Sequence, residues 1–327
     1  MGLKLKELGE REIIQRIFSS SGIKQEKDDC AVIKFKGQNL LISTDSVSLP
    51  THFFPEVEPE TMGSFLAAIN LSDIAAMAGE PDSFLLSLQV PGDYQYSFLD
   101  DFVSGLTRML RSYNTRLDGG DTKEGVNFEA TGFVMGYQKP KSTLYRSRIR
   151  KNQVLCTTNK MGKAASGYVF YRSSYRKELG LKLMYDIKPR IKEASLIAQY
   201  GGKFMMDLSD GLYSSIGQMK RDYGIGFRIV EDELPPDSHV KKAADLSGAT
   251  PAEVMCRFGG DYELLFTIDN SDYRDFKEAM ESNKIAVSFI GDTWDGENMM
   301  FDGNSWHLID DPGYEHFAPK PKLGRIE

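Results

Sequence analysis

The sequence predicts two domains, each of mixed α/β or α+β class. The chain has 327 residues, and at roughly 150 residues per domain this length suggests about two. Stretches with helical and with strand periodicity alternate in both halves, which is typical of mixed folds. The segment 139–143, followed by a basic run to Lys151, is the best candidate for a boundary. We therefore expect an N-terminal domain over residues 1–139 and a C-terminal domain over 140–327.

In the first half, apolar residues at 13, 14, 17 and 18 have helical spacing, and two apolar stretches around Gly37-Gln38-Asn39 indicate a hairpin. Pro59 suits the first turn of a long helix. The elements expected there are a helix at 10–19, strands at 30–36 and 40–44, a helix at 59–78, a strand at 83–90, a helix at 96–113 and a strand at 127–137. A short strand is also expected just before Gly119-Gly120-Asp121.

The second half continues the alternation of strands and helices. The elements expected there are a strand at 154–158, a helical stretch near 164–175, a helix from Pro189, a strand at 203–206, a helix at 211–223, strands at 227–230 and 264–268, a helix near 272–283 and a strand at 287–290. Strands and helices in both halves are the basis for the two-domain prediction.

Composition and charge exclude several classes of protein. The formal charge is -7, and this acidity argues against a nucleic-acid surface, because phosphate backbones attract dense Lys and Arg. We expect no transmembrane helix, since no run of 18 apolar residues occurs. The three cysteines are widely spaced and odd in number, so neither a disulfide framework nor a zinc site is indicated. A reduced, cytoplasmic protein is the simplest expectation.

The common nucleotide-binding and catalytic motifs are missing from the sequence. There is no G-x-x-x-x-G-K-[ST] loop, no G-x-G-x-x-G after a strand and no protein-kinase signature set. The sequence also lacks a G-x-S-x-G nucleophile turn and a paired-histidine zinc motif. Any nucleotide chemistry must therefore use another scaffold.

Aspartates instead recur beside small residues and at the ends of expected strands. Seven of them are Asp28, Asp29, Asp45, Asp73, Asp121, Asp207 and Asp210, with hydroxyl neighbours at Ser43, Thr44 and Ser209. Sets of oxygen ligands suit Mg²⁺, which bridges substrate phosphates, whereas zinc and copper would attract His and Cys. Together these residues predict a site that binds Mg²⁺ and phosphate.

Each aspartate alone also has a simpler interpretation. Asp73 follows Ile69 by four residues on an apolar helix stripe, where a carboxylate is costly unless it is paired, capped or metal-bound. Asp45 suits an ordinary turn, and the adjacent pair Asp28 and Asp29 suits an exposed turn. The segment before the helix at 211–223 could provide caps through Ser209 and Asp210, and Gly119-Gly120-Asp121 could be a plain turn. These alternatives remain open on residues alone.

A further set of motifs occurs in a fixed order along the chain: Leu8-Gly9-Glu10, Ile42-Ser43-Thr44-Asp45, His52-Phe53, Asn70-Leu71-Ser72-Asp73-Ile74-Ala75-Ala76-Met77, Gly119-Gly120-Asp121-Thr122, Asp207-Leu208-Ser209-Asp210-Gly211-Leu212, Gly259-Gly260-Asp261-Tyr262-Glu263-Leu264 and Gly313-Tyr314-Glu315-His316-Phe317. With these segments the chain resembles the thiamine-monophosphate kinase family, in the superfamily of aminoimidazole ribonucleotide synthetase, selenophosphate synthetase and a hydrogenase-maturation protein. They extend over nearly the whole chain.

The resemblance implies transfer of the γ-phosphoryl group of ATP to thiamine monophosphate, with several Mg²⁺ ions and no phosphoenzyme. It also implies a homodimer in which the N-terminal sheets of two subunits pair, and a C-terminal α/β sandwich. The implied metal ligands are Asp28, Asp29, Ser43, Thr44, Asp45, Asp73, Asp121, Asp207 and Asp210, among which Asp45, Asp73 and Asp210 would be catalytic. The implied ATP-binding residues are Gly120, Asp121, Arg146 and Ser209. The implied acceptor-binding residues are His52, Asp261 and Tyr314.

The sequence departs from the family pattern in three places. Lys27 stands where a glycine usually precedes the first Asp pair, and the usual G-G-E-D-Y-E is one acidic residue short, so that Asp261 is a stand-in. The R-P-x-P-R segment is reduced to Lys188-Pro189-Arg190. On residues alone, Arg146 could be a solvated charge in a basic run, and His52 and Tyr314 could simply pack. Two other functions remain open: another ATP-using enzyme of the superfamily, or a non-catalytic nucleotide-binding regulator.

Overall fold

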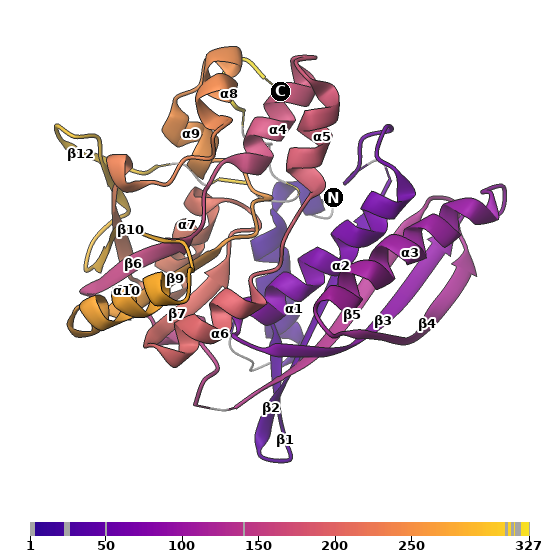
Figure 1. The fold of residues 1–327 in the computed structure, drawn as a ribbon, viewed down its shortest axis with the longest axis horizontal. Coiled ribbons are helices and arrows are strands. Elements are labelled where there is room, and N and C mark those ends of the chain that lie inside the picture. The colour runs from indigo at the N-terminus through magenta and orange to yellow at the C-terminus, as the bar shows by residue number, and fades with distance from the viewer. Residues whose placement is uncertain are drawn as a thin grey trace.

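The computed structural model contains two β-sheets, one in each half of the chain (Figure 1). It describes residues 4–22, 27–49, 51–139, 141–310, 313, 314, 317 and 322–326. Glu315 and His316 of the terminal motif, and Pro140 at the expected boundary, lie outside the described residues. Among the described residues, no helix has the length and apolar character needed to cross a membrane.

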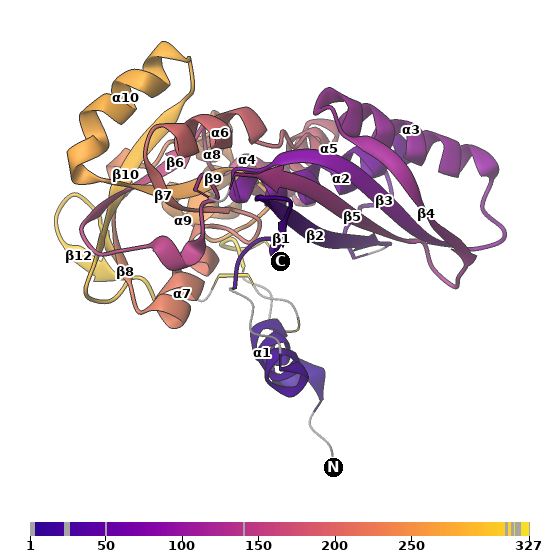
Figure 2. The ribbon, with the colours of Figure 1, turned by 90° about the horizontal axis from the view of Figure 1, so that it is seen from below.

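The first sheet has five strands in the order β1-β2-β5-β3-β4. Its strands are β1 (Ala31–Phe35), β2 (Gln38–Ser48), β3 (Glu80–Val90), β4 (Arg116–Glu124) and β5 (Glu129–Gln138). The helices of this half are α1 (Glu10–Ser21), α2 (Pro59–Ala76) and α3 (Tyr96–Ser112), with a short 3-10 turn at Leu5–Glu7. Helices α2 and α3 lie on one face of the sheet (Figure 2), and α1 stands apart from both layers.

The second sheet has seven strands in the order β12-β11-β8-β10-β6-β9-β7. Its strands are β6 (Gln153–Thr158), β7 (Gly202–Asp207), β8 (Gly226–Val230), β9 (Leu264–Asp269), β10 (Val287–Trp294), β11 (Met299–Phe301) and β12 (Trp306–Leu308). The helices of this half are α4 (Lys163–Arg172), α5 (Lys177–Tyr185), α6 (Ile191–Gln199), α7 (Leu212–Tyr223), α8 (Val240–Ser247), α9 (Pro251–Cys256) and α10 (Tyr273–Ser282), and 3-10 turns occur at Arg146–Arg148, Glu231–Glu233 and Asn270–Asp272.

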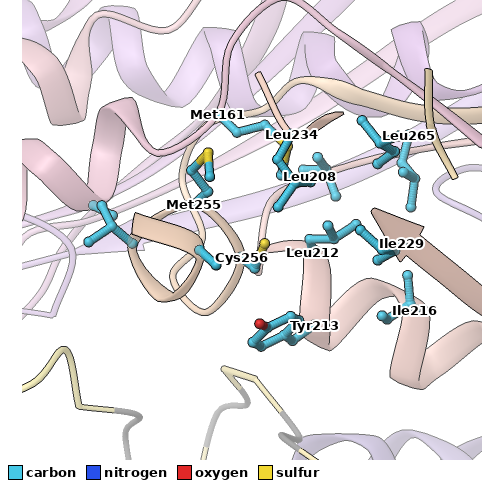
Figure 3. Close-up of a cluster of buried hydrophobic side chains, with 14 of the residues drawn as sticks. Met161, Leu208, Leu212, Tyr213, Ile216, Ile229, Leu234, Met255, Cys256 and Leu265 are labelled. Atoms are coloured by element: carbon cyan, nitrogen blue, oxygen red, sulfur yellow. The ribbon is translucent and has the colours of Figure 1, made fainter. Parts of the chain in front are cut away.

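Helices cover both faces of the second sheet, because its strands are apolar on both sides. Leu155 and Leu265 belong to one buried cluster, and their neighbours Cys156 and Phe266 belong to another. Successive side chains of a strand point to opposite faces, so the two clusters lie on opposite sides of the sheet. The first cluster includes residues of α7 and α9 (Figure 3), and the second includes residues of α6 and α10. The mixed α/β class and the sandwich of the second half are therefore observed.

The sequence prediction was wrong about the Gly119-Gly120-Asp121 segment. These residues do not follow a short strand; they lie inside β4, which pairs in parallel with β3 at the edge of the first sheet. Most of β4 is exposed, so its residues have no apolar alternation that could reveal a strand. Pairing with β3 forms the strand here. The short or mixed-pattern elements α5, α8, α9, β11 and β12 were also not predicted.

Helix α2 connects the two halves of the molecule. It packs on α3, β2 and β5 of the first half, and on α6 and β7 of the second. Its buried residues occupy most of its circumference, from Met62 to Ala76. A helix that is apolar on nearly all sides belongs in an interior. Side chains at the C-terminal end of α2 therefore lie where the two halves meet.

Two glycines allow α2 and α3 to cross at backbone distance. A Cβ atom on Gly63 would lie 1.9 Å from the carbonyl oxygen of Phe102, and one on Gly105 would lie 1.9 Å from the carbonyl oxygen of Glu60. Both obstacles are backbone atoms, so neither can turn away. Any larger residue at 63 or 105 must push the helices apart.

We expect Gly105→Ala to destabilise the protein by about 1–3 kcal/mol, the usual cost of overpacking a core. The better helix propensity of alanine, worth about 1 kcal/mol, offsets only part of that cost. Ser104→Ala, at an exposed position of the same helix, should change stability by less than about 0.5 kcal/mol. Thermal unfolding followed by calorimetry measures both, and equal midpoints for the two variants would contradict the close crossing.

Candidate active site

Strand β2 presents two of the predicted site residues to α2 and the third to the other face of the sheet. Leu41 and Val47 are fully buried under the helices, and strand alternation places Ser43 and Asp45 on that same face. The hydroxyl of Ser43 donates a hydrogen bond to the carboxylate of Asp73. Thr44 points the other way and is exposed, and its hydroxyl donates to the carbonyl oxygen of Gly132 at 2.9 Å.

Three carboxylates meet between the two halves of the chain. One oxygen each of Asp29, Asp73 and Asp207 lies within 4.8 Å of the others. Asp29 precedes β1, Asp73 lies near the end of α2, and Asp207 ends β7. The hydroxyl of Ser72 donates to Asp207 at 2.6 Å, so the helix that carries Asp73 also orients Asp207. We name Asp29, Asp73 and Asp207 the carboxylate cluster.

Burial and repulsion by neighbouring acids disfavour negative charge on Asp73 and Asp207. Burial, followed by the charges of Asp45, Asp207 and Asp29, raises the pKa of Asp73 well above its usual range. Burial and the charge of Asp29 raise the pKa of Asp207 to about 7, against the opposing effects of Ser72 and Arg146. Burial also raises the pKa of Asp45, although a hydrogen bond with Asp73 opposes this. Such a group of acids favours a bound cation.

Arg146 compensates part of this charge from inside the protein. Its guanidinium group makes two hydrogen bonds to Asp29, at 3.1 and 2.6 Å, and its backbone N–H donates to Asp28 at 2.7 Å. Burial disfavours the charged form of Arg146, but its interactions with Asp29 and Asp28 raise its pKa above the usual value. The interpretation of Arg146 as a solvated charge was wrong, because only 9% of the residue is exposed.

Ser209 and Asp210 lie in the turn between β7 and α7, just after Asp207 of the cluster. The N-cap residue of α7 is Gly211, so neither Ser209 nor Asp210 occupies the N-cap position. A neighbouring segment, residues 258–263, packs against this turn. The N–H of Gly260 donates to the carbonyl oxygen of Ser209 at 2.8 Å, and a Cβ on Gly259 would lie 2.0 Å from that same oxygen.

The carboxylate of Asp261 binds the N-terminus of α4. It accepts hydrogen bonds from the N–H groups of Gly162 at 2.5 Å and Ala164 at 2.8 Å. Burial raises the pKa of Asp261 to about 6, although these two bonds act in the opposite direction. A carboxylate at a helix N-terminus satisfies N–H groups that have no partner within the helix. The described contacts of Asp261 are therefore with the protein backbone.

The sequence did not indicate a role for the side chains of Tyr262 and Glu263. Glu263 is buried and pairs with the guanidinium of Arg190 at 2.8 and 2.5 Å, and it accepts from Thr158 at 2.7 Å. Tyr262 lies beside Phe65 of α2, and burial together with Asp45, Asp207, Asp210 and Asp73 raises its pKa well above the usual range. The reduced Lys188-Pro189-Arg190 segment could have indicated a partner for Glu263, whereas nothing in the sequence indicates the position of Tyr262.

His52 follows β2 in the chain, and Tyr314 contacts α7. The Nδ1 atom of His52 accepts from the backbone N–H of Ser48 at 3.1 Å, and the carbonyl oxygen of His52 accepts from the hydroxyl of Tyr185 at 3.0 Å. The carbonyl oxygen of Tyr314 accepts from Ser214 of α7 at 3.0 Å. Burial, followed by the charges of Asp210 and Glu10, raises the pKa of Tyr314, which is consistent with a position near Asp210.

Gly120 and Asp121 are not brought to the carboxylate cluster within this chain. The register aligns Gly120 with Leu86, Gly132 and Asp45 across β3, β5 and β2, so Gly120 lies three strands from Asp45. Asp121 is exposed and forms an ion pair with Lys123 at 3.0 Å. The structure thus gathers Asp28, Asp29, Ser43, Asp45, Asp73, Asp207 and Arg146 but leaves Gly120, Asp121 and the Thr44 hydroxyl elsewhere.

Comparisons with known proteins find relatives over nearly the whole chain. The family model for the N-terminal domain of AIR synthase related proteins matches residues 27–137. The thiamine-monophosphate kinase of Escherichia coli (strain K12) is 31% identical over 330 aligned residues, which cover 95% of this chain and 98% of that protein. The thiamine-monophosphate kinase of Aquifex aeolicus (strain VF5) is 27% identical over 321 residues and covers 96% of this chain and 100% of that protein.

Solved structures share the fold over almost the whole chain. AaThiL complexed with AMPPCP and TMP is similar with a TM-score of 0.85 and 26% identity, covering 97% of this chain and 99% of that chain. The hydrogenase maturation protein HypE of E. coli has a TM-score of 0.72 at 17% identity, over 94% of this chain and 99% of that chain, and this likeness concerns the fold alone. The full-length match at 31% identity decides the family. As its motifs predict, this chain belongs to the thiamine-monophosphate kinase family.

Proposed function

We propose that this protein transfers the γ-phosphoryl group of ATP to the phosphate of thiamine monophosphate and so forms thiamine diphosphate. The observation that carries the proposal is the carboxylate cluster, in a chain of which 95% matches the thiamine-monophosphate kinase of Escherichia coli. The ligand AMPPCP of AaThiL is a methylene analogue of ATP, which supports ATP as the donor. Phosphoryl transfer needs positioning and charge neutralisation more than covalent catalysis.

The residues of the cluster fit Mg²⁺. The potential ligands are carboxylate oxygens close enough to share an ion, and hard oxygen ligands suit Mg²⁺. Asp29, Asp73 and Asp207 would hold the ion, and we propose Asp28, Ser43, Asp45 and Asp210 as further ligands of the several ions. We also propose Thr44 and Asp121 as ligands; because their side chains lie away from the cluster within this chain, any ion that they bind would lie outside it. Bound Mg²⁺ would neutralise phosphate charge and bridge phosphate oxygens.

Hydrogen bonds within the chain orient the carboxylates of the cluster in the absence of substrate. Arg146 fixes the plane of Asp29 with a two-pronged contact, and Ser72 holds Asp207 by one oxygen. Bonds of this kind hold side chains in the orientation that a ligand needs. The acceptor is a phosphate oxygen that is already largely ionised near neutral pH, so no strong general base is required. The three cysteines are buried, which argues against a thiol nucleophile.

The sites of the two substrates are also proposals. We assign ATP to Gly120, Asp121, Arg146 and Ser209, and the acceptor to His52, Asp261 and Tyr314. Among the acceptor residues, Asp261 has its carboxylate on the α4 backbone. We therefore propose that Asp261 acts on the acceptor by shaping the segment 258–263.

Purified protein with Mg²⁺, ATP and thiamine monophosphate should yield thiamine diphosphate and ADP in equal amounts. Chromatographic separation of the two products measures this, with omission of Mg²⁺ as the control. Turnover with a different phosphorylated acceptor, and none with thiamine monophosphate, would favour another ATP-using enzyme of the superfamily. ATP binding without turnover on any acceptor would favour a regulator.

Asp73→Asn should lower kcat by more than about 100-fold, because it removes a ligand charge from the cluster. In EDTA the variant should unfold at a higher temperature than the wild type, since burial and repulsion already disfavour the charged Asp73. Added Mg²⁺ should then raise the midpoint of the wild type more than that of the variant. Asp100→Asn, on the exposed surface of α3, is the matched control. Near-full activity of Asp73→Asn would remove Asp73 from the metal ligands.

We further propose that the protein is a homodimer joined through the first sheet. The face opposite α2 and α3 exposes apolar side chains, with Phe133 40% and Leu85 37% exposed, and these two residues are paired neighbours on β5 and β3. An exposed apolar patch in the middle of a sheet favours a partner surface. The resemblance to the family supports a second copy as that partner.

Phe133→Glu should convert the dimer to a monomer in sedimentation velocity. The charge would have to be desolvated at the interface, which is unfavourable without a partner of opposite sign. Val126→Glu, a fully exposed position in the turn between β4 and β5, should leave the sedimentation coefficient unchanged. A wild type that sediments as a monomer, or a Phe133→Glu variant that still dimerises, would contradict this interface.

A further inference from the structure

Tyr262 has a backbone conformation that a bulky residue seldom adopts. Its φ is 51°, in the left-handed region where a side chain collides with its own backbone. Glycine would suit the position, and two glycines occur just before it in Gly259-Gly260. A strained aromatic residue persists only where its surroundings impose it, and such residues often lie at functional sites.

The backbone around Tyr262 is fixed to the turn that carries Asp207 and Asp210. The N–H of Tyr262 donates to the carbonyl oxygen of Leu208 at 3.2 Å, and the N–H of Leu208 donates to the carbonyl oxygen of Glu263 at 2.8 Å. Next to these two hydrogen bonds, strands β7 and β9 pair with each other, and Asp207 lies opposite Leu264. Tyr262 therefore moves with the strand end that carries Asp207.

The side chains on either side of Tyr262 are both bound elsewhere. Asp261 accepts from two N–H groups at the start of α4. Glu263 is held by the guanidinium of Arg190 and the hydroxyl of Thr158. Because the side chains before and after Tyr262 are both anchored, the segment cannot rotate. The two anchors together impose the backbone conformation of Tyr262.

The ring of Tyr262 lies against α2, the helix that carries Asp73. It meets Phe65 edge to face, with centroids 6.3 Å apart and an interplanar angle of 89°. Phe65 is on the same helix as Asp73, two turns earlier. Asp45, Asp73, Asp207 and Asp210 all act electrostatically on the Tyr262 hydroxyl. By its ring contact with Phe65 and its backbone bond to Leu208, Tyr262 lies between α2 and the turn after β7, the two elements that carry Asp73 and Asp210.

We propose that the hydroxyl of Tyr262 is a catalytic hydrogen-bond donor to the phosphoryl group that is transferred over the carboxylate cluster, an inference that rests on the proposed function. A phenol suits this task, because it donates a hydrogen bond while remaining neutral. A further carboxylate there would repel the phosphates, and an ammonium or guanidinium group would compete with the cation for the acids. No proton is transferred: the O–H bond of Tyr262 stays intact, and the hydrogen bond strengthens as charge develops on the phosphoryl oxygens.

Tyr262→Phe tests the hydroxyl while retaining the ring that packs on Phe65. With Mg²⁺, ATP and thiamine monophosphate, its kcat should fall roughly 10- to 100-fold, the effect of one hydrogen bond to a charged group. Binding of AMPPCP with Mg²⁺, measured by calorimetry, should stay within about twofold of the wild type, and the thermal midpoint should not fall. The matched control is Tyr273→Phe, whose ring packs on Phe289 of the second sheet, and its kcat should equal that of the wild type.

The outcomes separate the inference from the function on which it rests. A wild type without turnover on thiamine monophosphate overturns the proposed function, and the inference with it. An active wild type with equal activity in Tyr262→Phe overturns the inference alone. A lowered kcat accompanied by weaker AMPPCP binding and a lower midpoint would assign Tyr262 a purely structural role, which also overturns it. Only the loss of kcat with binding and stability retained supports the donor.

Discussion

Repulsion among the buried carboxylates of Asp29, Asp73 and Asp207 is the constraint on which the rest of the structure depends. Their oxygens lie within 4.8 Å of one another, and the raised pKa values of Asp73 and Asp207 indicate that the fold disfavours their charged forms. One guanidinium group, from Arg146, opposes this repulsion directly, and hydroxyl groups orient the remaining oxygens. Apolar packing elsewhere must offset the remainder, since buried charge is costly. The carboxylate cluster therefore lowers the stability of the fold and raises its affinity for cations.

Helix α2 supplies much of that packing and also sets the geometry of the cluster. Its side chains at Leu66, Leu71 and Ile74 are fully buried, and each such side chain contributes about 1.5–3 kcal/mol. The same helix carries Asp73 and, one residue before it, Ser72, which bonds to Asp207 of the other half. A single rigid element therefore determines the distance between two of the three acids. Because α2 contacts both sheets, any shift between the halves would change that distance.

Much of this fold could be predicted from the sequence, because its long elements have clear periodicity. Strand β3 and helix α3 alternate or repeat their apolar residues, and both occur close to the expected residues. Strand β4 has the sequence RLDGGDTKE and is mostly exposed, so only its pairing with β3 defines it. The class of fold follows from local pattern, whereas an exposed edge strand follows from its neighbour.

The candidate site was predictable in its residue types but not in its contacts. The sequence alone left open whether Asp73 is capped, paired or part of a cluster. The answer depends on Asp207, which bonds to Ser72 beside Asp73 although Ser72 and Asp207 are 135 residues apart in sequence. Arg146 lies in a basic run that gave no sign of burial. Strand alternation could have separated Thr44 from Ser43 and Asp45 once the buried face of β2 was known. That face was defined only by the helices packed on it.

The segment Gly259-Gly260-Asp261, which is one acidic residue shorter than the family pattern, contacts the turn after β7. The resemblance implies a glutamate between Gly260 and Asp261, and its absence removes one negative charge beside acids that already repel one another. The contacts that fix the segment are nevertheless complete: Asp261 is bonded to α4, Glu263 to Arg190, and the backbone to the turn after β7. The deletion therefore changes the charge and the space offered to an acceptor while Tyr262 keeps its place. For this reason we expect the departure to affect the choice of acceptor more than the transfer itself.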